Sequence, residues 1–287
     1  MSRWQQWLKN SLCSAQGGLE MAAVWHPPTH FHSRHGANVC VDASRTRATR
    51  VKSFANGVCF SQEPLQPGQI FLVEIEEKEL GWCGHLRLGL TAHDPRGLDA
   101  VPEYSLPDLV NLGDSWVFAI TRNHNHVLPH GAENQGPARL QGLLADPYLR
   151  IGQFRIPRDK LVGRSRPGRY SHLLDDLYKT NVLPPTARRS RVGVLYTVQP
   201  GGTADMHIVI NGEDMGPSAR GLPASRPLYA VVDIFASTKS VRIIQVEYGL
   251  PSLQTLCRMA IQKHIAHRLD LDGLDLPPVL KNFCKYE

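Results

Sequence analysis

Residues 71–76 read Phe-Leu-Val-Glu-Ile-Glu, and residues 86–90 read Leu-Arg-Leu-Gly-Leu. Every second residue in these stretches is apolar, which is the period of a β-strand with one buried face. Similar patterns or apolar runs recur along the chain, at residues 116–120, 192–198, 206–210, 228–235 and 241–246. The run that ends at residue 210 leads into Asn211-Gly212, a dipeptide typical of two-residue hairpins. The spacing therefore predicts many short antiparallel strands.

The composition agrees with a mainly β fold. The chain has 287 residues, with 21 prolines and 24 glycines that separate the apolar runs. Strands of this number with few helical patterns favour a two-sheet antiparallel β-sandwich or jelly roll. Residues 122–190 interrupt the regular spacing, and their one periodic stretch is at 173–178. We interpret them as a long surface excursion with one short helix, or alternatively as an additional strand pair.

The segment 251–265 has a helical pattern instead. Its apolar residues recur every three or four positions and form one stripe of an amphipathic helix: Leu253, Leu256, Cys257, Ala260, Ile261 and Ile265. The sequence Leu-Asp-Leu-Pro-Pro at 274–278 ends the helical region, because proline lacks the backbone donor. Such a terminal helix either packs on its own domain, as in a self-contained interaction module, or offers its apolar face to a partner.

The residue types in this segment favour a partner. Ser252, Leu253, Cys257 and Ile261 together resemble the Elongin-binding box of the SOCS-box family. The resemblance implies that Elongin B and Elongin C are partners, with contacts from Leu253, Leu256, Cys257, Ile261 and Ile265. Residues 274–280 resemble the cullin box of that family, which implies contacts from Leu274, Leu276, Pro277, Pro278 and Leu280. Cullin five with a RING-box protein is favoured, although Asp275 replaces the first proline of the usual Leu-Pro-aliphatic-Pro pattern.

The body of the chain carries a second resemblance. The sequence motifs that carry it include Phe-His-Ser-Arg-His-Gly at 31–36, Ser-Phe-Ala-Asn-Gly-Val at 53–58 and the run Leu-Tyr-Ala-Val-Val-Asp-Ile-Phe at 228–235. These resemble the neuralized homology repeat over residues 23–246, and the whole chain is similar to the SOCS-box branch of the neuralized-like family. The resemblance implies an SPRY-like sandwich at 23–246, after an N-terminal extension at 1–22 and before a small helical SOCS box at 250–287.

This pairing of modules implies a substrate-recognition adaptor of an Elongin, cullin and RING ubiquitin ligase that promotes ubiquitination and degradation of a bound protein. The six cysteines (13, 40, 59, 83, 257 and 284) contain no Cys-x-x-Cys pair, so we expect no RING finger and no catalytic residue. Loops on a rigid scaffold commonly carry binding. The candidate substrate-binding residues lie in three such loops, which connect strands that we expect to be near one another: Asn56 and Gly57; His93 and Asp94; Asn211, Gly212 and Asp214. The two Asn-Gly pairs are equally well explained as turns.

The formal net charge of +6 suggests an acidic partner. Two clusters of basic residues could steer such a partner, or they could be solvated loop and strand ends. The first cluster comprises Arg45, Arg47, Arg50 and Lys52, and the second comprises Arg188, Arg189 and Arg191. We find no recognition helix or zinc-finger spacing, and therefore expect no nucleic-acid partner. No stretch is long and apolar enough for a membrane span or a signal peptide, so a cytosolic protein is expected, with entry into the nucleus left open.

The histidines support a rival hypothesis, a metalloenzyme. One cluster comprises His26, His30, His32, His35 and Cys40, and a second comprises His124, His126 and His130. Histidine and cysteine are common zinc ligands, but neither spacing matches a familiar ligand signature. We therefore expect no metal and no cofactor.

Overall fold

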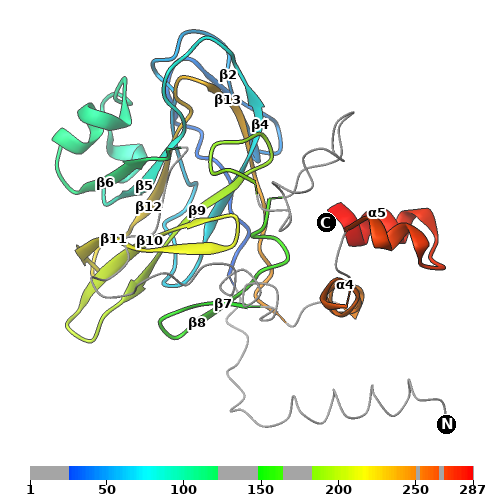
Figure 1. Cartoon of the computed structure of the whole chain (residues 1–287). Helices are drawn as coiled ribbons and strands as arrows, with labels where there is room; N and C mark the ends of the chain where they lie inside the picture. Colours follow the sequence, from blue (N-terminus) through cyan, green and yellow to red (C-terminus); the bar gives the residue numbers. More distant parts are fainter. Residues whose placement is uncertain (1–25, 122–147, 164–182, 250–252, 265–267, 287) are drawn as a thin grey trace, which may run out of the picture.

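The computed structural model describes residues 26–121, 148–163, 183–249, 253–264 and 268–286. Two antiparallel sheets form a sandwich, and two helices follow near the C-terminus (Figure 1). The prediction of a mainly β, two-sheet antiparallel sandwich with a small helical C-terminal part is therefore confirmed.

The larger sheet has seven strands. Their order across the sheet is β1 (Val39–Val41), β2 (Arg47–Arg50), β13 (Thr238–Ile243), β4 (Phe71–Lys78), β9 (Arg191–Val198), β10 (Thr203–Ile210) and β11 (Glu213–Pro223). The turn between β10 and β11 is the predicted Asn211-Gly212 pair, with positive φ angles of 47° and 84°. Because asparagine and glycine tolerate this conformation, the turn closes a tight hairpin.

The smaller sheet has the order β3 (Val58–Phe60), β12 (Tyr229–Asp233), β5 (Arg87–Thr91) and β6 (Ser115–Ala119). A separate hairpin consists of β7 (Tyr148–Ile151) and β8 (Phe154–Pro157). Within the segment 122–190 the described residues thus contain the additional strand pair, which was our alternative interpretation. The helix predicted at 173–178 lies outside the described residues.

Three apolar clusters hold these layers together. The main core lies between the two sheets and includes Phe71, Val73, Leu88, Leu90 and Val232. The second lies between the outer face of the seven-stranded sheet and the β7–β8 hairpin. The third covers the outer face of the four-stranded sheet. Each fully buried Leu, Val or Phe side chain contributes roughly 1.5–3 kcal/mol, so the sandwich has ample apolar burial to define its own fold.

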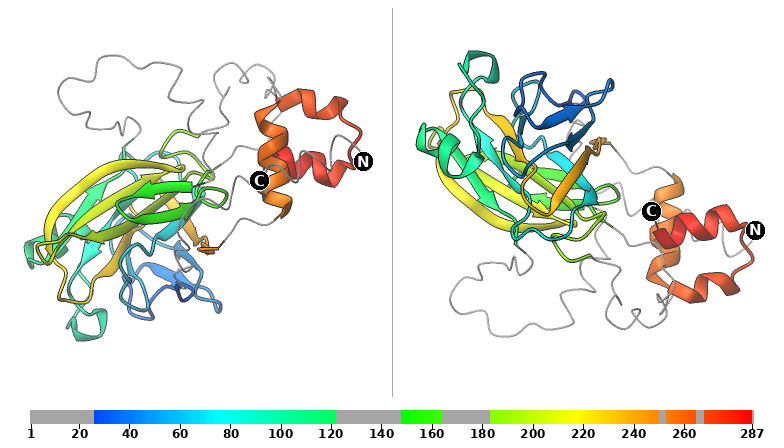
Figure 2. Two further views of the ribbon diagram at one scale, coloured as in Figure 1. Left: turned by 90° about the horizontal axis from the view of Figure 1, so that it is seen from below. Right: turned by 90° about the horizontal axis from the view of Figure 1, so that it is seen from above.

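The helical elements are short. Helical turns occupy Pro95–Gly97, Ser105–Leu109 and Arg268–Gly273, and the two longer helices are α4 (Leu253–Lys263) and α5 (Pro278–Tyr286). Figure 2 shows α4 and α5 to one side of the sandwich, beyond the segment that follows β13. Of the helices that the structure describes, none is long and apolar enough to cross a membrane.

Candidate functional site

Three apolar residues of helix α4 lie on its solvent side. Leu253 is 71% exposed and Leu256 is 44% exposed, and Cys257 is also exposed. Among the side chains of this helix that the structure describes, the buried ones are instead Thr255 and Arg258. An isolated helix gains little from exposed leucines, because burial is what makes an apolar stripe stabilising. The face predicted to meet Elongin is therefore open in the free chain.

The remaining residues predicted to contact Elongin are Ile261 and Ile265. Ile261 is half-buried, as is the neighbouring Ala260, and Ile265 lies outside the described residues. The exposed part of the stripe is thus its N-terminal half. Neither residue type nor spacing alone shows this difference in exposure between the two halves of the stripe.

The buried side of α4 packs against α5. The Arg258 guanidinium lies 4.9 Å from the centroid of the Phe283 ring, within the range of a cation–π contact. Lys285 on α5 forms an ion pair with Asp272, and Lys281 donates to the Asp272 carbonyl oxygen at 2.8 Å. The ion pair holds the pKa of the Asp272 carboxyl below its usual value. These contacts join both helices and the turn between them into one small unit.

The predicted cullin-binding residues connect this turn to α5. Leu274 and Leu276 are half-buried, whereas Pro277 and Pro278 are exposed. Leu280 is 37% exposed, and its neighbour Val279 is 78% exposed. Pro278 is the first residue of α5, a position where the missing proline donor costs nothing. The C-terminal part therefore presents a second exposed apolar segment, distinct in sequence from that of α4.

The three loops predicted to bind a substrate do not meet at one place. Strand β3 follows Asn56-Gly57 and begins beside Asp233, at the C-terminal end of β12. Strand β5 precedes His93-Asp94 and ends beside Tyr229, at the N-terminal end of β12. The two loops therefore lie at opposite ends of the four-stranded sheet. The third loop, at 211–214, belongs to the other sheet. The expectation that these loops lie near one another is corrected by the antiparallel order of the strands.

Several residues of these loops have structural partners. Asn211 is buried, and its amide donates to the Leu183 carbonyl oxygen and to Ser190 Oγ, both at 2.7 Å. A Cβ added to Gly212 would lie 2.8 Å from the Val162 side chain. Asp214 accepts from His207 at 3.1 Å. A role of this loop in substrate binding stays a prediction.

The other two loops are similarly tied to their surroundings. Asn56 has a φ of 54°, and its backbone N–H donates to the Glu103 carbonyl oxygen at 2.8 Å. A Cβ on Gly57 would lie 2.6 Å from the Ile234 carbonyl oxygen. His93 Nε2 lies 2.9 Å from the Gly113 carbonyl oxygen, and Asp94 pairs with Arg96 at 2.8 Å. These contacts fix the conformation of both loops, and substrate binding by both loops also stays a prediction.

The end of the sandwich next to Asn56-Gly57 carries a group of aromatic side chains that the sequence did not suggest. The Phe54 ring lies 5.0 Å from Trp82, 6.3 Å from Tyr104 and 6.0 Å from Phe235. We call these four residues the aromatic end. Trp82 is 44% exposed, and Leu80 before it is 94% exposed. Large apolar side chains grouped on loops in this way are typical of a protein-binding surface.

A buried ion pair supports the aromatic end from inside. The Arg87 guanidinium lies 3.6 Å from the Phe235 ring centroid, and its Nη1 lies 3.3 Å from Asp233 Oδ2. Asp233 is fully buried and accepts from the Ser105 backbone N–H at 3.0 Å and from Ser105 Oγ at 2.7 Å. Burial raises the pKa of the Asp233 carboxyl above its ordinary value, although the bonds from Ser105 and Arg87 oppose this shift. The signal that could have found this site is aromatic residues inside glycine- and serine-rich loops.

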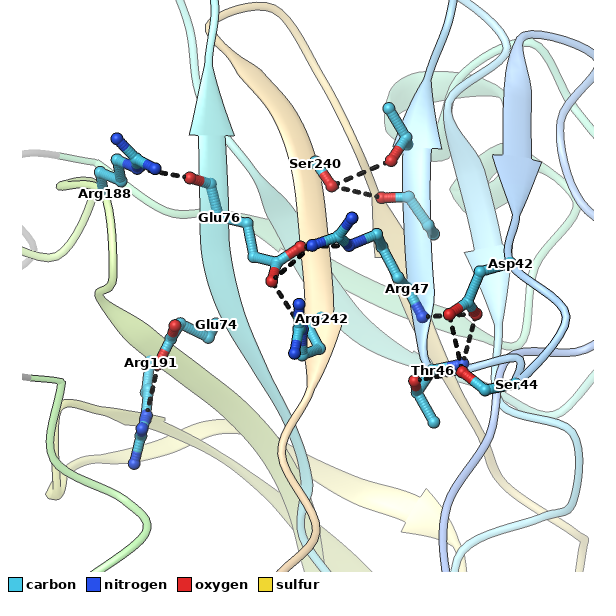
Figure 3. A network of polar contacts seen from close by, with 12 residues as sticks. Asp42, Ser44, Thr46, Arg47, Glu74, Glu76, Arg188, Arg191, Ser240 and Arg242 are labelled. Atoms are coloured by element: carbon cyan, nitrogen blue, oxygen red, sulfur yellow. Dashed lines mark hydrogen bonds and ion pairs between the residues drawn. The ribbon is translucent and has the colours of Figure 1, made fainter. Parts of the chain in front are cut away.

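The two basic clusters of the sequence meet on the outer face of the seven-stranded sheet. Figure 3 shows the Glu76 carboxylate between Arg47 on β2 and Arg242 on β13, each with an ion-pair distance of 2.6 Å. Arg188 donates to the Glu76 carbonyl oxygen at 2.8 Å, and Arg191 pairs with Glu74 at 2.9 Å. These arginines are therefore engaged in a network across neighbouring strands.

Arg50 behaves differently from the rest of its cluster. Its side chain is buried and donates to the Ala236 and Lys52 carbonyl oxygens, at 2.6 Å and 2.8 Å. It also pairs with Glu79 at 3.1 Å. Arg50 thus stabilises the end of the sheet, and its burial fits neither of the two alternatives, a steering patch or a solvated strand end.

The histidine cluster does not assemble into a metal site. Among the described residues, no group of three or more His, Cys, Asp or Glu side chains is arranged to hold a metal ion. His26 contacts Gln66 and the Tyr248 ring, and His32 Nδ1 accepts from the Arg34 backbone N–H at 2.8 Å. Burial lowers the pKa of both imidazoles. His124, His126 and His130 lie outside the described residues.

Comparison with known proteins supports both modules. The Neuralized family model matches residues 31–245, and the SOCS box model matches residues 249–285. Neuralized-like protein 2 of Homo sapiens is 70% identical over 285 residues, which cover 96% of this chain and 100% of that protein. The protein of that name from Mus musculus is 74% identical over 264 residues, or 91% of this chain and 93% of the relative.

More distant relatives match only parts of the chain. The E3 ubiquitin-protein ligase NEURL1B of Mus musculus is 38% identical over 125 residues, or 42% of this chain and 23% of that protein. The crystal structure of the neuralized-nhr1 domain of Drosophila melanogaster shares the fold, with a TM-score of 0.51 and 21% identity over 77% of this chain and 99% of that chain. From the family match and the near full-length relatives it follows that the chain belongs to the Neuralized family and combines its domain with a SOCS box.

Proposed function

We propose that this protein is the substrate-recognition subunit of an Elongin, cullin and RING ubiquitin ligase. In this proposal the protein has no catalytic residue of its own, and the ligase subunits ubiquitinate a protein that the sandwich holds. The observation that carries the proposal is the outward-facing apolar stripe of α4, at Leu253, Leu256 and Cys257. An exposed stripe on a short helix suits helix-in-groove recognition, in which a few apolar side chains enter pockets of the partner.

The apolar burial available on this face supports docking of a partner, and the match to the SOCS box points to Elongin C. Burying Leu253 and Leu256 would contribute roughly 1.5–3 kcal/mol each. Cys257 lies one turn after Leu253, so the small thiol would enter the same groove. Because the helix is already folded, little conformational entropy is lost on binding. Elongin B would join the complex through Elongin C.

The exposed segment at Pro277–Leu280 is the proposed contact for the cullin and its RING-box protein. Cullin five is our preferred candidate, and Asp275 is the residue on which this choice depends. Its carboxylate is exposed and replaces an apolar proline of the usual pattern, which removes one apolar contact. We also propose that the protein acts in the cytosol. The described cysteines are free thiols, as expected in a reducing compartment.

The proposed substrate-binding surface is the aromatic end. Trp82 and Leu80 are exposed there, and loops from both sheets surround them. Tryptophan is enriched among the residues that dominate binding energy at protein interfaces. The more distant mouse relative NEURL1B is named an E3 ubiquitin-protein ligase, and this name supports ubiquitination as the outcome of binding.

A reciprocal experiment tests the two surfaces. Full-length variants are expressed in cells with a proximity label, with and without a proteasome inhibitor. Leu253→Ala with Cys257→Ser should lose Elongin C but retain the proteins that accumulate under inhibition. Leu80→Ser with Trp82→Ala should lose those proteins and retain Elongin C.

Matched controls keep the result specific. Gln254→Ala changes an exposed residue of α4 outside the stripe, and Val198→Ser changes an exposed residue on β9. Both should behave as the unmodified protein. If Elongin C still co-purifies with the Leu253 and Cys257 variant, the assignment of the α4 stripe as the Elongin-binding face is contradicted. If the Trp82 variant keeps all its accumulating partners, the aromatic end is not the substrate site.

A further inference from the structure

The segment between the sandwich and the SOCS box is packed onto the sandwich. Ile244, Val246 and Tyr248 alternate along it and contact the second apolar cluster, which includes Ile70 and Leu72. The Ile244 N–H donates to the Leu72 carbonyl oxygen at 2.9 Å. This segment is therefore an extension of β13 that covers part of the seven-stranded sheet.

Hydrogen bonds fix the far end of this segment. The Ile70 backbone N–H donates to the Tyr248 hydroxyl at 2.6 Å, and desolvation raises the pKa of this phenol. The Tyr248 ring also contacts the His26 ring, with 4.3 Å between the centroids. Tyr248 thus joins three stretches of chain, around residues 26, 70 and 248.

Gln245 completes the connection to the N-terminal stretch. Its side-chain oxygen accepts from the Thr29 backbone N–H at 3.0 Å, and its side-chain amide donates to the Thr29 carbonyl oxygen at 2.6 Å. One glutamine side chain therefore satisfies both backbone groups of Thr29, as a neighbouring strand would. We call residues 26–30 and 244–248 together the clasp.

The clasp limits how far the SOCS box can move. Tyr248 and Leu253, the first residue of α4, are separated by five Cα steps. At up to about 3.6 Å per residue, α4 begins within about 18 Å of Tyr248. Without the clasp, the last fixed residue would be Ile243 in β13, and the ten steps to Leu253 would allow about 36 Å.

We propose that the clasp is a positioning device that sets the distance between the bound substrate and the ligase. Tyr248 and Gln245 are its positioning residues, and neither belongs to the surfaces proposed to bind substrate or Elongin. Doubling the reach of the SOCS box increases the volume that it can occupy about eightfold. The local concentration of a substrate lysine at the site of ubiquitin transfer falls accordingly. The effect on ubiquitination rests on the proposed function, whereas the restriction of the SOCS box does not.

Distance measurement between spin labels tests the restriction directly in the full chain. One label is placed at Cys257 on α4 and the other at Glu77→Cys on β4, with Cys13, Cys40 and Cys83 changed to serine. Tyr248→Ala and, separately, Gln245→Ala should widen the distance distribution, the former at least twofold. Gln245 is exposed, so its variant keeps the core intact if Tyr248→Ala does not fold. Distributions as narrow as in the parent protein for the folded variants would overturn the proposal.

A second arm tests the consequence for the reaction. Insertion of Gly-Ser-Gly-Ser between Gly249 and Leu250 lengthens the tether and leaves the clasp in place. The same insertion between Gly201 and Gly202, an exposed turn, is the control. With the reconstituted ligase, the first insertion should lower ubiquitination of the captured proteins at least threefold without changing Elongin C binding, and the control should not. If the unmodified chain does not bind Elongin C, the ligase role alone is contradicted. If the variants with the two insertions ubiquitinate the captured proteins equally well, the positioning role is overturned.

Discussion

Asp233 is a buried carboxyl group on which the aromatic end depends. Its Oδ2 atom accepts from Ser105 and pairs with Arg87, and Arg87 in turn lies over the Phe235 ring. A buried carboxylate is costly because it has lost its hydration, and the bonds from Ser105 and Arg87 offset only part of that cost. At this residue, stability of the sandwich and the shape of the proposed substrate surface are therefore linked.

The first prediction concerns the pH dependence of Asp233→Asn. Since folding raises the pKa of this carboxyl above 3.8, the folded state favours the protonated form. The unmodified protein should then lose stability relative to the asparagine variant as the pH rises from below 3.8 through the raised pKa. Asparagine retains one acceptor and carries no charge at any pH. Urea unfolding between about pH 3 and pH 7 measures the difference, and parallel stability curves would contradict the assignment.

Asp233→Ala serves as the contrasting variant at neutral pH. It removes the acceptor for Ser105 and leaves Arg87 without its carboxylate partner. Breaking a buried pair in this way costs about 3 kcal/mol. An alanine variant as stable as the unmodified protein would show that the pair contributes nothing to the fold.

At the scale of elements, the SOCS box depends on the buried side of α4. Arg258 is buried and contacts the Phe283 ring on α5, so the packing of the two helices involves a charged residue. The exposed leucines of the same helix contribute little to this packing. Folding of the helix pair and the proposed binding of Elongin C therefore use opposite faces of α4.

The second prediction is that Arg258→Ala weakens Elongin C binding without removing a contact residue. Loss of the cation–π contact and of the buried stem should cost about 1–2 kcal/mol of helix packing. Amide hydrogen exchange in α5 should accelerate, and the affinity for Elongin C should fall. Gln254→Ala on the exposed side is the matched control. Unchanged exchange in α5 would show that the two helices do not depend on Arg258.

Alternation and turn chemistry predicted most of the sandwich, because these signals are local. Residues 71–76 and 86–90 lie in or next to β4 and β5, and Asn211-Gly212 forms the turn between β10 and β11. The helix predicted within 251–265 corresponds to α4. Local signals could not show that Arg258 faces inward, since the stripe of leucines suggested the opposite.

The aromatic end was missed because it consists of residues far apart in sequence. Phe54, Trp82, Tyr104 and Phe235 come from four separate loops, and loop residues have no periodicity that predicts their neighbours. The expectation that the three candidate substrate-binding loops lie near one another was wrong for the same reason. Which end of a sheet a loop occupies depends on strand order, and strand order is a property of the whole fold.

At the scale of the whole molecule, the sandwich and the SOCS box are held by different cores. In the described chain, the three apolar clusters of the sandwich contain no residue of α4 or α5. Leu271 and Cys284 are buried within the C-terminal part. The clasp ends at Tyr248, just before the match to the SOCS box begins at residue 249. The two modules therefore have separate sources of stability.

The third prediction follows from this separation and decides between the proposed adaptor and a self-contained interaction module. If α4 stabilised the sandwich, removal of residues 250–287 would unfold residues 23–246. We expect instead that the melting temperature of the remaining chain changes by no more than about 3 °C, which corresponds to about 1 kcal/mol for a domain of this size. The truncated chain should also retain its substrates and lose Elongin C. Because the cut follows Tyr248, the clasp stays complete, and a large drop in melting temperature would have to come from lost contacts of the SOCS box itself.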